Sequence, residues 1–247
     1  MYLNVNGQNI YYQKMGKGKN LIILHGWKQD VSSFWGIIDS LKEDFTLWLI
    51  DLPGFGRSDP PNSSFNISDY AKSIAEFIKL NKINKPILLG HSVGGNVSIK
   101  LAATFPTLID KLILEDSSGI RPQKSLQKNL FYILAKGFKY LIPNLFGVKE
   151  RFQVKFYKAI GSDYLNAGDL KETLVKILNE DLISYLPKIQ AETLIIWGEK
   201  DTVVKSRIGK RMYQLIPRSR MEIIDGVGHF PHLESPERFV HYVKDFS

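Results

Sequence analysis

The stretch Pro86-Ile87-Leu88-Leu89-Gly90-His91-Ser92-Val93-Gly94-Gly95 decides the fold of this chain. Its first four residues form an apolar run, and the residues behind Gly95 have the apolar spacing of a helix. The pattern G-x-S-x-G between a strand and a helix predicts a sharp turn, in which the serine has a strained backbone and an exposed hydroxyl. Positions 90 and 94 are both glycine, and we expect that side chains there would collide with neighbouring elements.

Short apolar runs on both sides of this turn predict the rest of a sheet. Asn6-Gly7 lies between two alternating segments, which is a signal of a β-hairpin. Six apolar runs have the character of strands, and the first four of them do not alternate, as is typical of strands covered on both faces. They are Asn20–Leu24, Phe45–Ile50, Pro86–Leu89, Lys111–Leu114, Thr193–Trp197 and Met221–Ile224. The predicted fold class is therefore α/β, with a mostly parallel eight-stranded sheet and helices on both faces.

Helical patterns separate these runs. Apolar residues from Tyr70 to Ile78 recur at helical spacing behind Ser68, which we expect to cap the helix. A last helix is expected from Ser235-Pro236-Glu237, where a capping serine precedes a proline at the first helical position.

Residues 119–190 break the alternation of strands and helices. No clear strand pattern occurs there, and prolines separate three helix-compatible clusters. The clusters are Leu126–Leu141, Glu150–Ile160 and Leu170–Leu186. We therefore predict a core domain of residues 1–118 and 191–247, with a helical domain of residues 119–190 inserted in it.

The composition excludes several classes of protein. The chain has 247 residues, 44% of them hydrophobic, and no cysteine, which removes disulfides, thiolate nucleophiles and cysteine–zinc sites. No apolar run approaches the roughly eighteen residues of a membrane-spanning helix, and the first residues do not resemble a signal peptide. We therefore expect a globular protein of the cytoplasm without a transmembrane segment.

The charge is uneven along the chain. The formal net charge is +8, and residues 119–190 alone hold 12 basic and 6 acidic residues. Such an excess of positive charge favours acidic partners or simply serves solubility. Because the sequence has neither a basic-aromatic RNA signature nor zinc-finger spacing, nucleic acid is not an expected partner.

A serine becomes a nucleophile when a nearby base removes its proton. His229 is the preferred base, because it follows a predicted strand in a glycine-rich loop, and such loops carry functional groups in α/β sheets. His232 is the competing candidate. The remaining histidines are expected to support turns or to lie on the surface; they are His25, His91 and His241.

An acid must fix the tautomer of the histidine and stabilise its imidazolium form. Asp201 follows a predicted strand, and the chain order Ser92, Asp201, His229 is the one expected for this kind of turn. Asp116, at the end of another predicted strand, is the alternative acid, and Glu199 is a further candidate.

Two backbone N–H groups are expected to bind a developing oxyanion. One belongs to Val93, directly after the serine, and the other to Trp27 in the loop His25-Gly26-Trp27. The Trp27 side chain can also form a wall of the pocket. The expected chemistry requires neither a metal nor an organic cofactor.

Five segments together resemble the α/β-hydrolase superfamily, in the order that the family has. They are Leu24–Trp27, Asp51–Ser58, Gly90–Gly95, Trp197–Asp201 and Gly228–Pro236. The resemblance implies that the nucleophile is Ser92, the acid Asp201 and the base His229. It also implies that residues 119–190 are the family's cap, which usually roofs the pocket. Aromatic candidates for an acyl pocket in this cap are Phe131, Phe138, Phe152 and Phe156.

The resemblance further implies a serine esterase that cleaves carboxylic esters through an acyl-enzyme. Ser92 argues against epoxide hydrolases and haloalkane dehalogenases, which have aspartate at this place. The segments between His25 and Ser58 are similar to pimeloyl-carrier-protein methyl ester esterases, and an acidic acyl-carrier protein would suit a basic cap. The same segments also resemble other carboxylesterases and perhydrolases. The alternatives are a carbon–carbon bond hydrolase or perhydrolase with the same three residues, and a non-catalytic ligand-binding protein.

Overall fold

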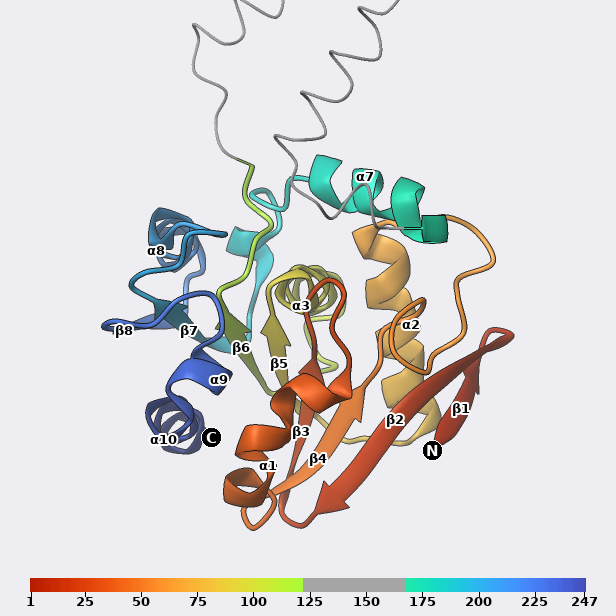
Figure 1. Ribbon diagram of the computed structural model, residues 1–247, viewed down its shortest axis with the longest axis horizontal. Helices are drawn as coiled ribbons and strands as arrows, with labels where there is room; N and C mark the ends of the chain where they lie inside the picture. Colours follow the sequence, from red (N-terminus) through yellow and green to blue (C-terminus); the bar gives the residue numbers. More distant parts are fainter. Residues whose placement is uncertain (122–167) are drawn as a thin grey trace, which may run out of the picture.

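An eight-stranded sheet forms the centre of the protein (Figure 1). The computed structural model describes residues 1–121 and 168–247. The strands are β1 (Tyr2–Val5), β2 (Gln8–Gly16), β3 (Lys19–Leu24), β4 (Phe45–Ile50), β5 (Ile87–His91), β6 (Lys111–Glu115), β7 (Glu192–Gly198) and β8 (Ser219–Ile224). They lie in the order β1-β2-β4-β3-β5-β6-β7-β8. Strand β2 is antiparallel to β1 and β4, and all other neighbours are parallel, which confirms the predicted sheet.

Helices cover both faces of this sheet, as predicted. Helices α2 (Ile67–Leu80), α3 (Val93–Thr104) and α8 (Ser206–Leu215) pack on one face, and α1 (Trp35–Leu41) and α10 (Pro236–Phe246) pack on the other. The other helical segments of the described residues are η1 (Val31–Phe34), η2 (Gly168–Leu170), α7 (Lys171–Asn179), η3 (Leu186–Lys188) and α9 (Pro231–Glu234). No helix within residues 1–121 and 168–247 has the length and apolar character needed to cross a bilayer.

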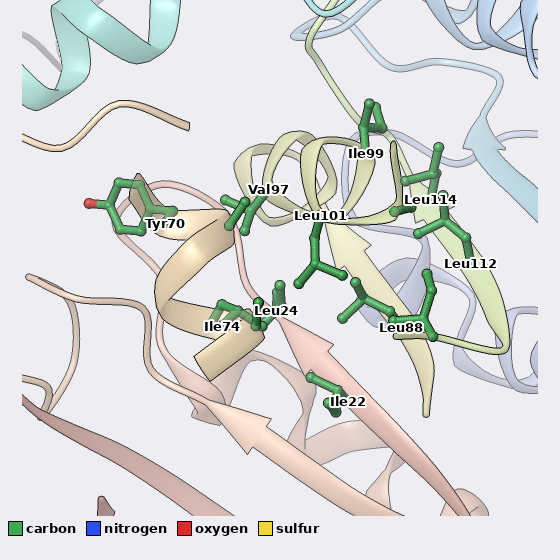
Figure 2. Packing of buried hydrophobic residues seen from close by; sticks show 14 of the residues in the cluster. Ile22, Leu24, Tyr70, Ile74, Leu88, Val97, Ile99, Leu101, Leu112 and Leu114 are labelled. Carbon is green, nitrogen blue, oxygen red and sulfur yellow. The ribbon is translucent and has the colours of Figure 1, made fainter. Parts of the chain in front are cut away.

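Alternate residues of the strands supply two apolar cores. Ile22 and Leu24 of β3 pack with α2 and α3 on one face, as Figure 2 shows, whereas Leu21 and Ile23 pack with the residues of α1 and α10 on the other. Because both faces are covered, the strands have continuous apolar runs instead of alternating ones. Each such buried side chain contributes about 1.5–3 kcal/mol relative to exposure.

Two helix starts differ from the prediction. Helix α2 is capped by Asn66 and not by Ser68. The Asn66 side chain accepts the Asp69 N–H at 3.1 Å, and the Asp69 carboxylate accepts the Asn66 N–H at 3.0 Å. This reciprocal capping box satisfies two backbone donors and leaves Ser68 inside the first turn. Ser235 occupies the capping position of α10, but its side chain makes no capping hydrogen bond.

Only the ends of the predicted insertion lie within the described residues. The cluster Leu170–Leu186 is helical in part, because α7 ends at Asn179 and Glu180 adopts an extended conformation with ψ of 134°. The clusters Leu126–Leu141 and Glu150–Ile160 lie outside the described residues. The division into a core and an inserted domain therefore stays a prediction.

One edge of the sheet gathers the loops that carry the candidate residues. Strands β3, β5, β6, β7 and β8 are parallel neighbours, so their carboxyl ends lie together. Each of these strands is followed by at least one candidate. In the order of the strands, the first choices are Trp27, Ser92, Asp116, Asp201 and His229, with Glu199 as a further candidate after β7 and His232 after β8.

Candidate active site

Ser92 lies in the turn between β5 and α3 with an unusual backbone conformation. Its φ is 50° and its ψ is −113°, values that residues with a side chain rarely adopt. Strain of this kind costs about 1–3 kcal/mol and persists where the surrounding structure enforces it. The turn is held by a hydrogen bond from the Ser92 N–H to the Glu115 carbonyl (2.9 Å) and by one from the Asn96 N–H to the Ser92 carbonyl (3.2 Å).

The glycines of this turn allow close packing, as expected. A side chain at Gly94 would overlap the carbonyl oxygen of Leu24, at the end of β3. A side chain at Gly90 would overlap the Gly94 carbonyl oxygen and the Ser98 hydroxyl. The start of α3 can therefore approach the neighbouring strand, which places the loop after β3 beside Ser92.

His229 connects Ser92 to Asp201 by hydrogen bonds. Its Nε2 is 3.3 Å from the Ser92 Oγ, and its Nδ1 is 2.7 Å from the Asp201 Oδ2. Because a carboxylate accepts, Nδ1 carries the proton of the neutral ring, and Nε2 is left to accept the serine proton. The structure thus brings together three residues that lie far apart in the sequence.

Asp201 is held by both of its oxygens. Its Oδ1 accepts the N–H groups of Val203 (2.6 Å) and Val204 (2.9 Å), while Oδ2 faces His229. Burial alone would raise the pKa of Asp201, but hydrogen bonds from His229, Asp116 and Val204 outweigh it and lower the pKa. Asp201 is therefore ionised at neutral pH and faces His229 as an anion.

Asp116 and Glu199, the other candidate acids, have different partners. The Asp116 oxygens accept the Gly198 N–H at 3.1 and 3.3 Å. Burial, contact with Asp201 and the charge of Glu115 raise the pKa of Asp116 to about 11, so this carboxyl is protonated at neutral pH. The exposed Glu199 accepts the Gly226 N–H at 2.9 Å.

His232, the competing base, is turned into the protein. Its Nδ1 lies 2.7 Å from the Glu115 Oε1, and its backbone N–H donates to the same oxygen at 2.9 Å. Both side chains are fully buried. Glu115 was not among the residues expected at the site. Its position as an acid at the end of an apolar strand was the feature of the sequence that could have indicated it.

The remaining histidines have structural surroundings, as expected. His25 donates from Nδ1 to the Gly26 carbonyl at 2.8 Å and accepts the Leu52 N–H at Nε2. Burial lowers the pKa of both His25 and His91, so both rings are neutral. His241 lies exposed on α10.

The two candidate oxyanion donors lie next to Ser92 in the chain or in space. Val93 is the first residue of α3, where backbone N–H groups have no partner within the helix. Trp27 lies in a turn closed by a hydrogen bond from the Gln29 N–H to the Gly26 carbonyl. A side chain atom at Gly26 would lie 3.3 Å from the Ser92 Cβ, so this turn passes beside the serine.

Among the residues that the structure describes, two groups of side chains have the composition of a metal site. Each offers three ligand atoms within 4.8 Å of one another; the groups are His91, Glu115 and His232, and Asp116, Asp201 and His229. The acyl-pocket candidates of the predicted cap lie outside the described residues; they are Phe131, Phe138, Phe152 and Phe156.

Comparisons with known proteins agree with this fold. A family model described as alpha/beta hydrolase fold matches residues 19–141 and 151–236. A pimeloyl-[acyl-carrier protein] methyl ester esterase of Vibrio campbellii is 26% identical over 97% of this chain and 98% of its own length. Two solved structures are also similar. A bacterial membrane phospholipase A has a TM-score of 0.79 at 26% identity, covering 100% of this chain and 84% of its own. An esterase of Exiguobacterium antarcticum has a TM-score of 0.76 at 25% identity, covering 98% and 96%.

Proposed function

The chain belongs to the α/β-hydrolase fold family, and we propose that it is a serine hydrolase that cleaves carboxylic esters through an acyl-enzyme. The observation that carries this proposal is the continuous contact from Asp201 through His229 to Ser92, at 2.7 and 3.3 Å. The esterases among the similar proteins support the choice of an ester as substrate.

In the first step, His229 acts as the general base. Its Nε2 takes the proton of the Ser92 hydroxyl while the oxygen attacks the carbonyl carbon of the ester. Asp201 holds the ring in the tautomer that can accept this proton and stabilises the imidazolium that forms. The Ser92–His229 contact of 3.3 Å is long for a hydrogen bond to oxygen, and such contacts often shorten when substrate binds.

The negative charge of the tetrahedral intermediate needs donors in fixed positions. The backbone N–H groups of Val93 and Trp27 are proposed to supply them, because one starts α3 and the other lies in the turn beside Ser92. The positive end of the α3 dipole acts in the same direction. Each donor of this kind is worth on the order of a hundredfold to a thousandfold in rate.

The second half of the reaction returns the enzyme to its starting state. His229 gives its proton to the departing alcohol, which leaves the acyl group on Ser92. A water molecule, deprotonated by the same histidine, then attacks the acyl carbonyl. The bond between the Ser92 Oγ and the acyl carbon breaks, His229 returns the proton to the Ser92 oxygen, and the acid leaves. One ester and one water give one acid and one alcohol, without a metal or an organic cofactor.

The labelling of Ser92 by a phosphonate probe tests this proposal. A serine-directed fluorophosphonate should add one adduct per chain at Ser92, read by intact mass and peptide mapping. A panel of p-nitrophenyl esters of increasing acyl length should be turned over. Folded protein that takes no label at Ser92 would instead support the ligand-binding alternative, and preference for a diketone over an ester would support the carbon–carbon hydrolase.

The presentation of the substrate by an acidic carrier protein is a narrower proposal. It is supported by the positive charge of residues 119–190, the predicted cap, and by the carrier-linked substrate in the name of the Vibrio relative. Charge attraction of this kind weakens as salt shortens the Debye length. Activity on a carrier-bound ester should therefore fall steeply between about 0.05 and 0.5 M salt, while activity on the free methyl ester stays level. Equal salt dependence of the two would remove the carrier from the proposal.

A further inference from the structure

Glu115 connects the two loops that carry Ser92 and His229. It is the last residue of β6, and its carbonyl oxygen accepts the Ser92 N–H at 2.9 Å. Its carboxyl oxygen Oε1 accepts both the backbone N–H and the Nδ1–H of His232, at 2.9 and 2.7 Å. One residue thus bonds to the nucleophile turn through its backbone and to the histidine loop through its side chain.

This contact is sealed from solvent. Glu115 and His232 are 0% exposed, and His91 is 1% exposed. The Phe34 ring stacks on His232 with centroids 4.3 Å apart, and the His91 ring lies 5.2 Å from His232 and 4.9 Å from His229. A buried carboxyl that loses its partners pays a large desolvation cost, so the two hydrogen bonds to Oε1 strongly favour one position of the loop.

The position of His232 in the chain gives this contact its effect on His229. The two histidines are separated only by Phe230 and Pro231, and Pro231 starts the short helix α9. Within the loop, Glu234 accepts the Gly228 N–H at 2.7 Å, which closes the segment on itself. The Glu115 side chain then fixes this closed segment against the end of β6. The backbone of the same residue accepts the hydrogen bond from the Ser92 N–H.

We propose that Glu115 is a positioning residue, which acts through His232 to set the distance between the His229 Nε2 and the Ser92 Oγ. The proposal rests on the proposed function for its kinetic consequences, but not for its geometric ones. A displacement of about 1 Å at a reacting group can cost on the order of a hundredfold in rate. The contact at 3.3 Å leaves little room for such a displacement.

Substitutions at Glu115 distinguish positioning from simple stability. Glu115→Ala should lower kcat by about tenfold to a hundredfold with KM changed less than about threefold, because substrate contacts are untouched. Glu115→Gln keeps an acceptor at Oε1, and its amide nitrogen replaces Oε2, which lies 3.7 Å from the His91 Nδ1. This conservative variant should restore kcat to within about threefold of the original protein.

A matched control lies on the same strand. Leu112 is buried in β6 and contacts neither loop by a side-chain hydrogen bond. Leu112→Ala should lower the melting temperature as a core truncation does, yet leave kcat unchanged at temperatures where the variant is folded. If Glu115→Ala does not fold, His232→Ala takes its place and should lower kcat by about tenfold. Glu115→Ala or His232→Ala with the kcat of Leu112→Ala would overturn the proposal.

A second readout does not depend on turnover. Ring protons shared between Nδ1 and a carboxylate give far-downfield proton NMR signals, and Asp201→Asn identifies the signal of His229. This signal should shift or disappear in Glu115→Ala and persist in Leu112→Ala. A protein that hydrolyses no ester would refute the proposed function, whereas an unchanged His229 signal in Glu115→Ala would refute the positioning role.

Discussion

Within residues 1–121 and 168–247, two carboxyl–imidazole pairs are joined by a hydrogen bond, and they differ in what the second ring nitrogen meets. In the Asp201–His229 pair and in the Glu115–His232 pair, Nδ1 lies 2.7 Å from a carboxyl oxygen. The Nε2 of His229 faces the Ser92 hydroxyl at 3.3 Å, whereas the Nε2 of His232 is buried and has no hydrogen-bond partner among the described residues. The two pairs are therefore alike at Nδ1 and differ at Nε2.

This difference shows that a carboxyl–histidine contact does not by itself define a general base. His232 lies inside α9 with its ring against Phe34, so its second nitrogen reaches no hydroxyl in the part of the chain that the structure describes. His229 precedes α9, and its ring reaches the edge of the sheet where β5 ends. Both histidines have a carboxyl partner. What separates a candidate base from a structural histidine is a hydroxyl within reach of its second ring nitrogen.

The largest expected effect comes from removing the hydroxyl that distinguishes the two pairs. Ser92→Ala should lower the turnover of a p-nitrophenyl ester by about a millionfold, as loss of the nucleophile does in serine proteases. Ser73→Ala, which truncates a buried serine of α2, is the control and should keep full turnover. A Ser92→Ala protein with more than about one per cent of the original turnover would show that Ser92 is not the nucleophile.

The next effect tests which acid belongs to the reactive pair. Asp201→Asn should lower kcat by about ten-thousandfold, because the amide would favour the wrong tautomer of His229. Asp116→Asn should keep kcat within about threefold, since a protonated Asp116 and an asparagine can both donate a hydrogen bond to Asp201. A large loss of kcat in Asp116→Asn together with a small loss in Asp201→Asn would show that Asp116, and not Asp201, is the acid that acts on His229.

The sequence was sufficient to predict that Asp201 and His229 meet Ser92, but not that Glu115 meets His232 beside them. The turn at Ser92 and the apolar runs that form the strands follow from local patterns, and the glycines near His229 favour it over His232. The Glu115–His232 contact joins residues separated by 117 positions, and no local pattern reports such a contact. The N-cap residue of α2 could have been predicted from the sequence. An acid at Asp69, three residues after Asn66, is the pattern of a capping box, but the prediction chose Ser68 instead.

The smallest effect concerns the pH dependence of stability and follows from the raised pKa of Asp116. An aspartate in an unfolded chain titrates near pH 3.9, whereas Asp116 in the folded protein titrates at about pH 11. Between these values the folded protein holds a proton that the unfolded chain has released. The free energy of unfolding therefore falls as pH rises, by up to about 1.4 kcal/mol per pH unit from this group.

Asp116→Asn removes this proton and with it the contribution of Asp116 to the pH dependence of stability. The substituted amide is neutral at every pH, so the variant should become more stable relative to the original protein as pH rises from about 6 to 8. Asp201, whose pKa is lowered, is ionised in both states over this range and adds no slope. Urea denaturation at both pH values measures the difference. Parallel curves for the two proteins would mean that Asp116 is ionised in the folded state.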